Sequence, residues 1–216
     1  MSQIALPLDA VSSAKDNSYI VTDANAEAHY YLQNWQSWPN LTAILVGDPS
    51  SGKSAMARKF EHDSGGYIAD DAELVADTDL FHLWNRAKEE RKPLLFVSGK
   101  PISEWNVELP DLKSRLAASL LIEINSPDEA MIEGLLQQYF SLRGLSVSKE
   151  AILYLNKRME RSYRNIQLLA QKMDNLAIER KKPINRGIAM EALSQHQMMA
   201  EQQNSGSAAP QNIEEG

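Results

Sequence analysis

The chain of 216 residues contains no cysteine, so it cannot form a disulfide, a thiolate metal site or a cysteine nucleophile. No apolar run approaches the length of a membrane span, and the first residues lack the basic-then-apolar pattern of a signal peptide. From these absences we expect a soluble, cytoplasmic protein without a membrane partner.

A surplus of basic residues is absent as well. The sequence has 22 Lys and Arg against 29 Asp and Glu, which gives a net charge of −7. Because phosphate neutralisation needs excess Lys and Arg, this composition argues against broad electrostatic attachment to nucleic acid. Two basic clusters, Lys157-Arg158 and Arg180-Lys181-Lys182, lie near predicted helix ends, where such clusters more often stabilise helix C-termini than bind DNA.

A complete G-x-x-x-x-G-K-S phosphate-binding loop is present at residues 47–54, between an apolar run at residues 43–46 and a helix-forming segment. In this setting the backbone N–H groups close around phosphate oxygens, the lysine supplies a charge, and the last serine can hold Mg²⁺. We therefore expect bound ADP or ATP. The residues expected to contact it are Gly47, Asp48, Pro49, Ser50, Ser51, Gly52, Lys53, Ser54 and Ala55.

The order of predicted elements divides the chain into two types of structure. Strands and helices alternate as far as residue 124, which favours a parallel sheet covered on both faces. After Asn125 only helices are predicted, the first of them capped by Ser126 and the second by Ser148. The expected divisions are an arm at residues 1–18, an α/β domain at 19–125, a helical domain at 126–201 and a disordered tail at 202–216.

Three further stretches carry a family resemblance: residues 81–86 (FHLWNR), 109–116 (LPDLKSRL) and 159–164 (MERSYR). Together with the phosphate-binding loop, they resemble the DnaA branch of the AAA+ ATPases. The resemblance extends from Gln3 to Leu193. It implies the parallel sheet of an AAA+ P-loop NTPase followed by a small helical lid domain.

The resemblance also assigns roles to single residues. Arg115 would be an arginine finger that acts on a nucleotide held by a neighbouring subunit, where a cation stabilises charge on the transferring phosphoryl group. A surface ion pair is the alternative for Arg115. Ser98 matches the first-sensor position, and Ile20 lies in a segment that resembles the adenine-binding box.

The lid sensor has two candidates in the resemblance. Arg164 fits the second-sensor position, where a lid arginine reaches the phosphates, and Arg161 is the competing assignment. The two arginines are three residues apart and so lie on neighbouring parts of a helix surface. A pair of solvated arginines near Glu160 is the alternative without function.

The acidic pair Asp70-Asp71 stands where a strand would present carboxylates to Mg²⁺ and water, with Ser54 and Asp70 as the expected metal ligands. Only 17 residues separate Lys53 from Asp70, too few for the usual additional strand and helix. Either the acidic strand is lost, or one edge strand with its helix is deleted. We favour deletion, because an edge strand pairs with one neighbour only, so its loss removes a single row of interstrand hydrogen bonds. Both interpretations make Mg²⁺ binding and intrinsic turnover uncertain.

The first residues of the chain resemble the Q-[LI]-x-L-P-L peptide with which Hda proteins, relatives of DnaA, bind the DNA polymerase sliding clamp. A flexible peptide of this kind buries apolar side chains in a preformed pocket while its glutamine fixes the register. The alternative is a strand that docks on the domain itself. The residues expected to bind the clamp are Gln3, Ile4, Leu6, Pro7 and Leu8.

Taken together, the resemblance implies a regulator that binds the clamp and promotes hydrolysis of DnaA-bound ATP, with DNA reached only through the clamp. Nothing after the lid resembles the helix-turn-helix domain of DnaA. Two alternatives stay open: an ATPase of the helicase-loader type, and a nucleotide-stabilised clamp adaptor without a catalytic role. Self-association also stays open.

Overall fold

The computed structural model describes residues 19–206, with side chains to residue 199. The chain divides into two compact units, each treated by itself below. The first contains residues 19–135 and 161–167, and the second contains residues 136–160 and 168–206. Within the described residues, no helix combines the length and the apolar character that crossing a bilayer requires.

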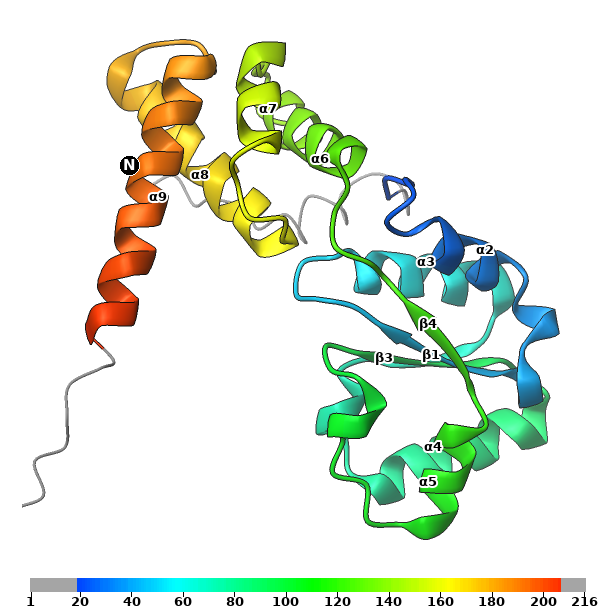
Figure 1. Ribbon diagram of the computed structural model, residues 1–216. Coiled ribbons are helices and arrows are strands. Elements are labelled where there is room, and N and C mark those ends of the chain that lie inside the picture. The colour runs from blue at the N-terminus through cyan, green and yellow to red at the C-terminus, as the bar shows by residue number, and fades with distance from the viewer. Residues whose placement is uncertain (1–18, 207–216) are drawn as a thin grey trace, which may run out of the picture. The chain divides into compact units, whose positions relative to one another are not determined.

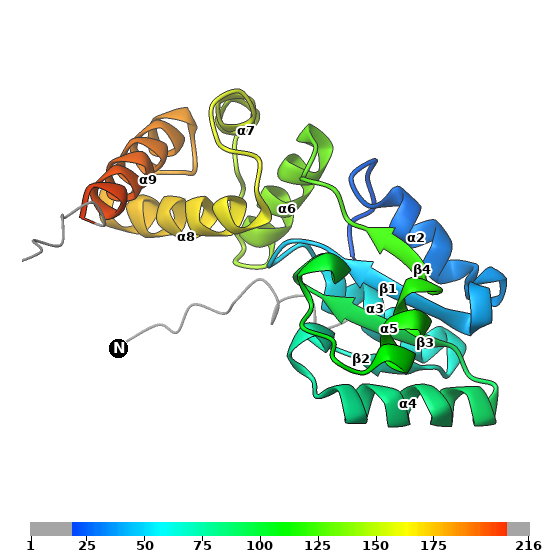
Figure 2. The same cartoon turned by 60° about the horizontal axis from the view of Figure 1, so that its bottom comes forward.

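The first unit is built on a four-stranded parallel sheet in the order β2-β3-β1-β4 (Figure 2). Thr42 of β1 pairs with Leu94 of β3, and Ala43 of β1 pairs with Leu120 of β4. The parallel α/β sheet predicted from the sequence is therefore confirmed. The strands are β1 (Thr42–Val46), β2 (Tyr67–Ala69), β3 (Leu94–Ser98) and β4 (Leu120–Glu123).

Side chains of the central strands alternate between two apolar cores, as the pleat requires. Ala43 and Leu45 of β1 lie in the core under helices α2 and α3, whereas Ile44 lies in the core under α4 and α5. Figure 1 shows these two helix pairs on opposite faces of the sheet. The helices are α2 (Ala26–Gln33), α3 (Lys53–Ser64), α4 (Asp77–Glu90) and α5 (Pro110–Ala117), and short 3₁₀ turns occur at η1 (Trp35–Ser37), η2 (Pro39–Leu41), η3 (Ala72–Leu74) and η4 (Ile102–Glu104).

Helix α6 (Glu129–Ser141) begins later than the sequence predicts. Its cap is Asp128, whose Oδ1 accepts a hydrogen bond from Met131 N at 2.7 Å. The prediction that Ser126 caps this helix is wrong, because Asp128 Oδ2 also accepts from Ala24 N at 3.0 Å and so joins the cap to a distant segment. Helix-capping rules consider only residues close in sequence, so they cannot predict the bond from Ala24 N to Asp128.

The second unit contains the end of α6, α7 (Lys149–Asn156), most of α8 (Tyr163–Arg180) and α9 (Arg186–Gly206). Ser148 caps α7 as predicted, with its Oγ accepting from Ala151 N at 3.2 Å. A parallel bridge between Val147 and Ile184 joins the segments that lead into α7 and α9. Helix α9 continues to Gly206, past the boundary at residue 202 where we expected a disordered tail, and residues 207–216 lie outside the described part.

Candidate functional site

The phosphate-binding loop joins β1 to α3 at the carboxyl end of the sheet. Gly52 has a φ of 89°, a left-handed conformation that glycine adopts without strain, and α3 begins at the next residue. A Cβ on Gly47 would lie 2.8 Å from Ser51 Oγ and 3.0 Å from Ile124 Cβ, so this position has no room for a side chain. The sequence thus folds locally into the turn that a phosphate cradle needs.

Lys53 lies at the centre of this site. Its Nζ donates hydrogen bonds to the carbonyl oxygens of Gly47 at 2.7 Å and Asp48 at 2.8 Å. Burial lowers the pKa of Lys53 below its ordinary value, while nearby carboxylates, foremost Asp70, oppose the shift. The lysine therefore occupies the space between the loop and the acidic pair, in contact with acceptors that a phosphate would replace.

A cavity of about 190 Å³ opens at the loop. Loop residues and the acidic pair face it from different elements, and the buried Ser51 Oγ has no hydrogen-bond partner in the described part of the chain. The N–H groups at a helix start and the ammonium group of Lys53 are donors that suit phosphate oxygens, whereas the Ser51 hydroxyl is enclosed beside Gly47. The residues that line the cavity are Pro49, Ser50, Ser51, Gly52, Lys53, Ser54, Ala55, Arg58, Asp70 and Asp71.

The acidic pair follows β2, which is an edge strand beside β3. Asp70 and Asp71 both line the cavity opposite Ser54. An edge strand that still delivers its carboxylates to the loop is what deletion of a neighbouring strand would leave, and it supports that interpretation over loss of the acidic strand. Within residues 19–206 there is no group of three or more His, Asp or Glu able to enclose a metal ion, so Mg²⁺ would depend on Ser54, the acidic pair and ligand oxygens.

Ser98 ends β3 and is completely buried. Its hydroxyl donates to the carbonyl oxygen of Lys100 at 2.7 Å and accepts from the amide of Lys100 at 2.9 Å. The structure therefore places Ser98 in a tight turn with both hydrogen-bonding directions in use. Its backbone carbonyl accepts from Gly47 N at 3.3 Å, which joins this turn to the phosphate-binding loop.

Glu73 is a site residue that sequence reasoning missed. Its Oε1 accepts a hydrogen bond from Gly99 N at 2.8 Å, and its Oε2 is buried without a partner in the described part of the chain. Its charge also acts on Lys53. Glu73 thus bonds to the turn after Ser98 and adds negative charge in the neighbourhood of Lys53. Its position three residues after Asp70 was the only available signal, and one acidic residue at that distance is too common to be specific.

The first turns of α8 belong to the same unit as the loop. Ser50 Oγ donates to Gln167 Oε1 at 2.9 Å, so this part of α8 lies against the phosphate-binding loop. Arg161 is paired with Glu129 at 3.0 Å. Arg164 is exposed and forms no ion pair among the described residues. Of the two lid candidates, Arg164 is the one whose charge is not already compensated nearby.

Ile20 lies against α6, where a Cβ on Gly134 would come within 3.1 Å of Ile20 Cδ1. Beside it, the Tyr19 hydroxyl and His29 Nδ1 are 2.8 Å apart. Burial, followed by the charge of Asp63, raises the pKa of Tyr19 to about 12, so the hydroxyl stays protonated. An apolar wall beside a neutral hydroxyl is an environment that a purine ring tolerates.

Arg115 lies on α5, away from the loop cavity. Its guanidinium donates to Asn85 Oδ1 at 2.8 Å and to Asp111 Oδ2 at 2.6 Å. It also stacks on Phe81 and Trp84, with ring centroids 4.3 Å and 3.9 Å away. The side chain is only 20% exposed, so the structure places this guanidinium in contacts with its own chain. The proposed clamp-binding residues, 3–8, lie outside the described part.

No protein-family model matches the chain. Among solved structures, domain III of the replication initiation protein DnaA from Thermotoga maritima is 14% identical with a TM-score of 0.68, covering 84% of this chain and 97% of that one. AMPPCP-bound DnaA from Aquifex aeolicus is 15% identical with a TM-score of 0.58, covering 74% and 63%. The R170A form of Thermotoga maritima RuvB is 15% identical with a TM-score of 0.57, covering 80% and 68%.

These similarities concern the fold, since identities near 15% establish nothing finer. The chain spans less than two thirds of the Aquifex DnaA chain and nearly all of the isolated DnaA domain. The chain therefore has an α/β fold similar to that of domain III of DnaA.

Proposed function

We propose that this protein binds ADP or ATP at the phosphate-binding loop. The observation that carries the proposal is the loop cavity, which is lined by Lys53 and the start of α3 together with the carboxylates of Asp70 and Asp71. Cationic and N–H donors suit the phosphates, and the carboxylates suit a divalent cation that accompanies them. The AMPPCP bound to the structurally similar DnaA of Aquifex aeolicus supports the same assignment.

The test is a titration of the full chain with fluorescent ADP and ATP analogues, with and without Mg²⁺, followed by measurement of turnover. We expect micromolar or tighter binding and slow turnover, because Ser98 and Glu73 are already bonded within the protein. Absence of detectable binding at about 1 mM nucleotide, the weak end of the usual affinity scale, would overturn the assignment.

A finer function follows from the resemblance to Hda proteins. In this function the arm at residues 3–8 binds the sliding clamp, and the chain promotes hydrolysis of ATP bound to DnaA. The support is the peptide pattern of the arm and the DnaA-related fold. A pull-down with purified clamp tests it, with Gln3→Ala and Leu6→Ala as variants that should each lose binding.

Arg115 is the proposed finger in this reaction. Acting on a nucleotide in DnaA would require its guanidinium to leave Asn85 and Asp111. The experiment compares wild type with Arg115→Lys and Arg115→Ala in DnaA-ATP hydrolysis with DNA-loaded clamp, alongside thermal melts. Loss of stimulation without loss of stability supports a finger, whereas equal loss of both assigns Arg115 to packing between α4 and α5.

Two alternative functions remain distinguishable by measurement. Steady ATP turnover by the isolated chain and binding to a replicative helicase would favour a loader-type ATPase. Clamp binding that does not depend on nucleotide, with no effect on hydrolysis by DnaA, would favour an adaptor. The short β2 edge and the engaged Ser98 weigh against fast turnover.

A further inference from the structure

The charges of the chain are divided unevenly between the two units. Residues 136–160 and 168–199 contain nine Lys and Arg but only five Asp and Glu. In the other unit, residues 19–135 and 161–167 contain 12 basic and 19 acidic residues. The overall charge of −7 therefore conceals a helical unit that is basic.

Most of the positive charge of the helical unit lies around α7 and the start of α9. The amide of Ser148 donates to the carbonyl oxygen of Ile184 at 2.9 Å, so the segments entering these two helices run side by side. The segment before α9 thus lies beside the start of α7, and Tyr154 links Arg158, after the end of α7, to Arg186; we call this region the basic end. It consists of seven exposed residues: Lys149, Lys157, Arg158, Arg180, Lys181, Lys182 and Arg186.

Tyr154 organises part of the basic end. The guanidinium of Arg158 lies 4.5 Å from the centre of the Tyr154 ring, and that of Arg186 lies 5.7 Å from it. One residue comes from just after α7 and the other from the start of α9, so a single ring holds two cations from different elements. Such stacking restricts the side chains before any ligand binds, and it leaves the ring occupied by guanidinium groups.

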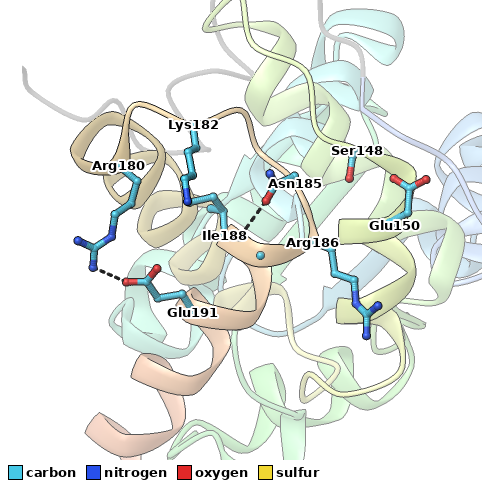
Figure 3. Close-up of a pocket in the computed structure, with 9 residues that line it drawn as sticks. Ser148, Glu150, Arg180, Lys182, Asn185, Arg186, Ile188 and Glu191 are labelled. Atoms are coloured by element: carbon cyan, nitrogen blue, oxygen red, sulfur yellow. Dashed lines mark hydrogen bonds and ion pairs between the residues drawn. The ribbon is translucent and has the colours of Figure 1, made fainter.

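A cavity of about 590 Å³ lies beside this pair, lined by Arg180, Lys182 and Arg186 among others (Figure 3). Two acids also line it. Glu191 is neutralised by Arg180 at 2.6 Å, and Glu150 is held by the Ser148 hydroxyl and its own amide. Lys182 and Arg186 form no ion pair with any described residue, and both face solvent. The charge of Glu191 also acts on Lys182, so the cavity lining carries three cations against two carboxylates and has one positive charge in excess.

We propose that the basic end binds the phosphodiester backbone of duplex DNA without sequence preference. Exposed Lys and Arg from the helices and connecting segments of the basic end provide spaced phosphate contacts, and releasing counterions from DNA would drive binding. Tyr154 is covered by its arginines and is not available to stack on bases, which favours backbone contacts over single-strand recognition. This contact goes beyond the proposed function, in which DNA is reached only through the clamp.

The test measures fluorescence anisotropy of a labelled duplex of about 20 base pairs with the full chain, between roughly 50 and 200 mM salt. The charge-reversing variant is Lys182→Glu/Arg186→Glu. The matched control, Lys88→Glu/Lys113→Glu, changes the net charge equally but uses exposed lysines of the α/β unit. We expect the first variant to bind the duplex at least about tenfold more weakly than wild type. The slope of the logarithm of its binding constant against the logarithm of the salt concentration should fall in magnitude by about two. The control should bind within about threefold of wild type.

Equal weakening by both variants would overturn the proposal, because it would show that net charge alone governs binding. Stronger binding to a single strand of the same length would also overturn it. If the first variant binds DNA normally but loses DnaA, the basic end is a protein-docking surface and the proposal is wrong. Lys181→Gln/Lys182→Gln, with both residues exposed between helices, repeats the measurement with a milder change, and thermal melts show that each variant is folded.

Discussion

The α/β unit and the helical unit present their charges in different ways. In the α/β unit, the groups proposed to bind nucleotide converge on one loop, where Lys53 and the start of α3 line a small cavity together with two carboxylates. In the helical unit, the basic groups are spread over exposed side chains of α7, the end of α8, the start of α9 and the segments that follow α7 and α8. A converged site depends strongly on each member, whereas a dispersed surface loses affinity in small steps. Substitutions in the two units should therefore differ in size as well as in the ligand they affect.

The largest effect is expected from Lys53→Ala. This change removes the cation at the centre of the loop cavity, and we expect ATP affinity to fall about 100-fold, or about 2.7 kcal/mol. Titration with a fluorescent ATP analogue measures it. Lys182→Ala in the helical unit is the matched control and should leave ATP affinity unchanged. Similar losses in both variants would remove the distinction between a converged site and a dispersed one.

A stability effect nearly as large is expected in the helical unit, at the pair formed by Arg143 and Asp174. Arg143 Nε lies 3.2 Å from Asp174 Oδ2, both side chains are about one fifth exposed, and the guanidinium lies 3.7 Å from the centre of the Tyr139 ring. Arg143→Leu leaves a poorly solvated carboxylate, which should lower the free energy of unfolding by about 2 kcal/mol. Denaturant melts measure the change.

The control for this pair is Arg143→Leu/Asp174→Leu, which removes both charges and should recover much of the lost stability. If the double variant is as unstable as the two single changes added together, the two residues do not interact. Nucleotide affinity should stay at the wild-type value in both variants, since the pair lies in the unit without the phosphate-binding loop.

The site in the α/β unit was predictable because its geometry is local in sequence. The strand β1, the loop at residues 47–54 and the start of α3 follow one another, and the positions of the glycines indicate where the backbone must turn. The parallel sheet was predictable for a similar reason, because each strand appears as its own apolar run. Ser148 at the start of α7 follows a rule that spans four residues, and it too was predicted.

Features that depend on distant partners were not predictable. Nothing in residues 109–116 shows that Arg115 is held by Asn85 and stacked on Phe81, because those contacts come from another helix. The bond from Ala24 N to Asp128 spans more than 100 residues, and it moved the start of α6 away from Ser126. The basic clusters were interpreted as separate helix ends, because the contacts that connect their neighbourhoods, the bridge between Val147 and Ile184 and the shared ring of Tyr154, join distant parts of the sequence.

A smaller effect on stability is expected from Asp128→Ala in the α/β unit. The variant loses the cap of α6 and the bond to Ala24 N, and the free energy of unfolding should fall by about 1 to 2 kcal/mol. Asp128→Asn keeps a capping oxygen and should lose less. Denaturant melts near neutral pH separate the three proteins, and equal stability of all three would mean that the cap has no effect.

The charge of Asp128 adds a pH dependence. Burial raises the pKa of this carboxyl, but hydrogen bonds from Met131 N, the Thr22 hydroxyl and backbone amides outweigh it and leave the pKa below its ordinary value of 3.8. A depressed folded-state pKa stabilises the protein above 3.8, and this stabilisation is lost as the pH falls through the folded-state value. The difference in free energy of unfolding between wild type and Asp128→Asn should therefore be largest at neutral pH and decrease as the pH falls.

The smallest effect is expected when each of the two lid arginines is replaced, and it should differ between them. Arg161 is already paired with Glu129, whereas Arg164 has no ion pair among the described residues and lies one turn before Gln167, which contacts Ser50 of the loop. An uncompensated cation near bound phosphates contributes more than one that shares its charge with a carboxylate. We expect Arg164→Ala to weaken ATP binding roughly fivefold and Arg161→Ala less than about twofold. The reverse order in the same titration would assign the sensor role to Arg161, and it would mean that the Glu129 pair opens when nucleotide binds.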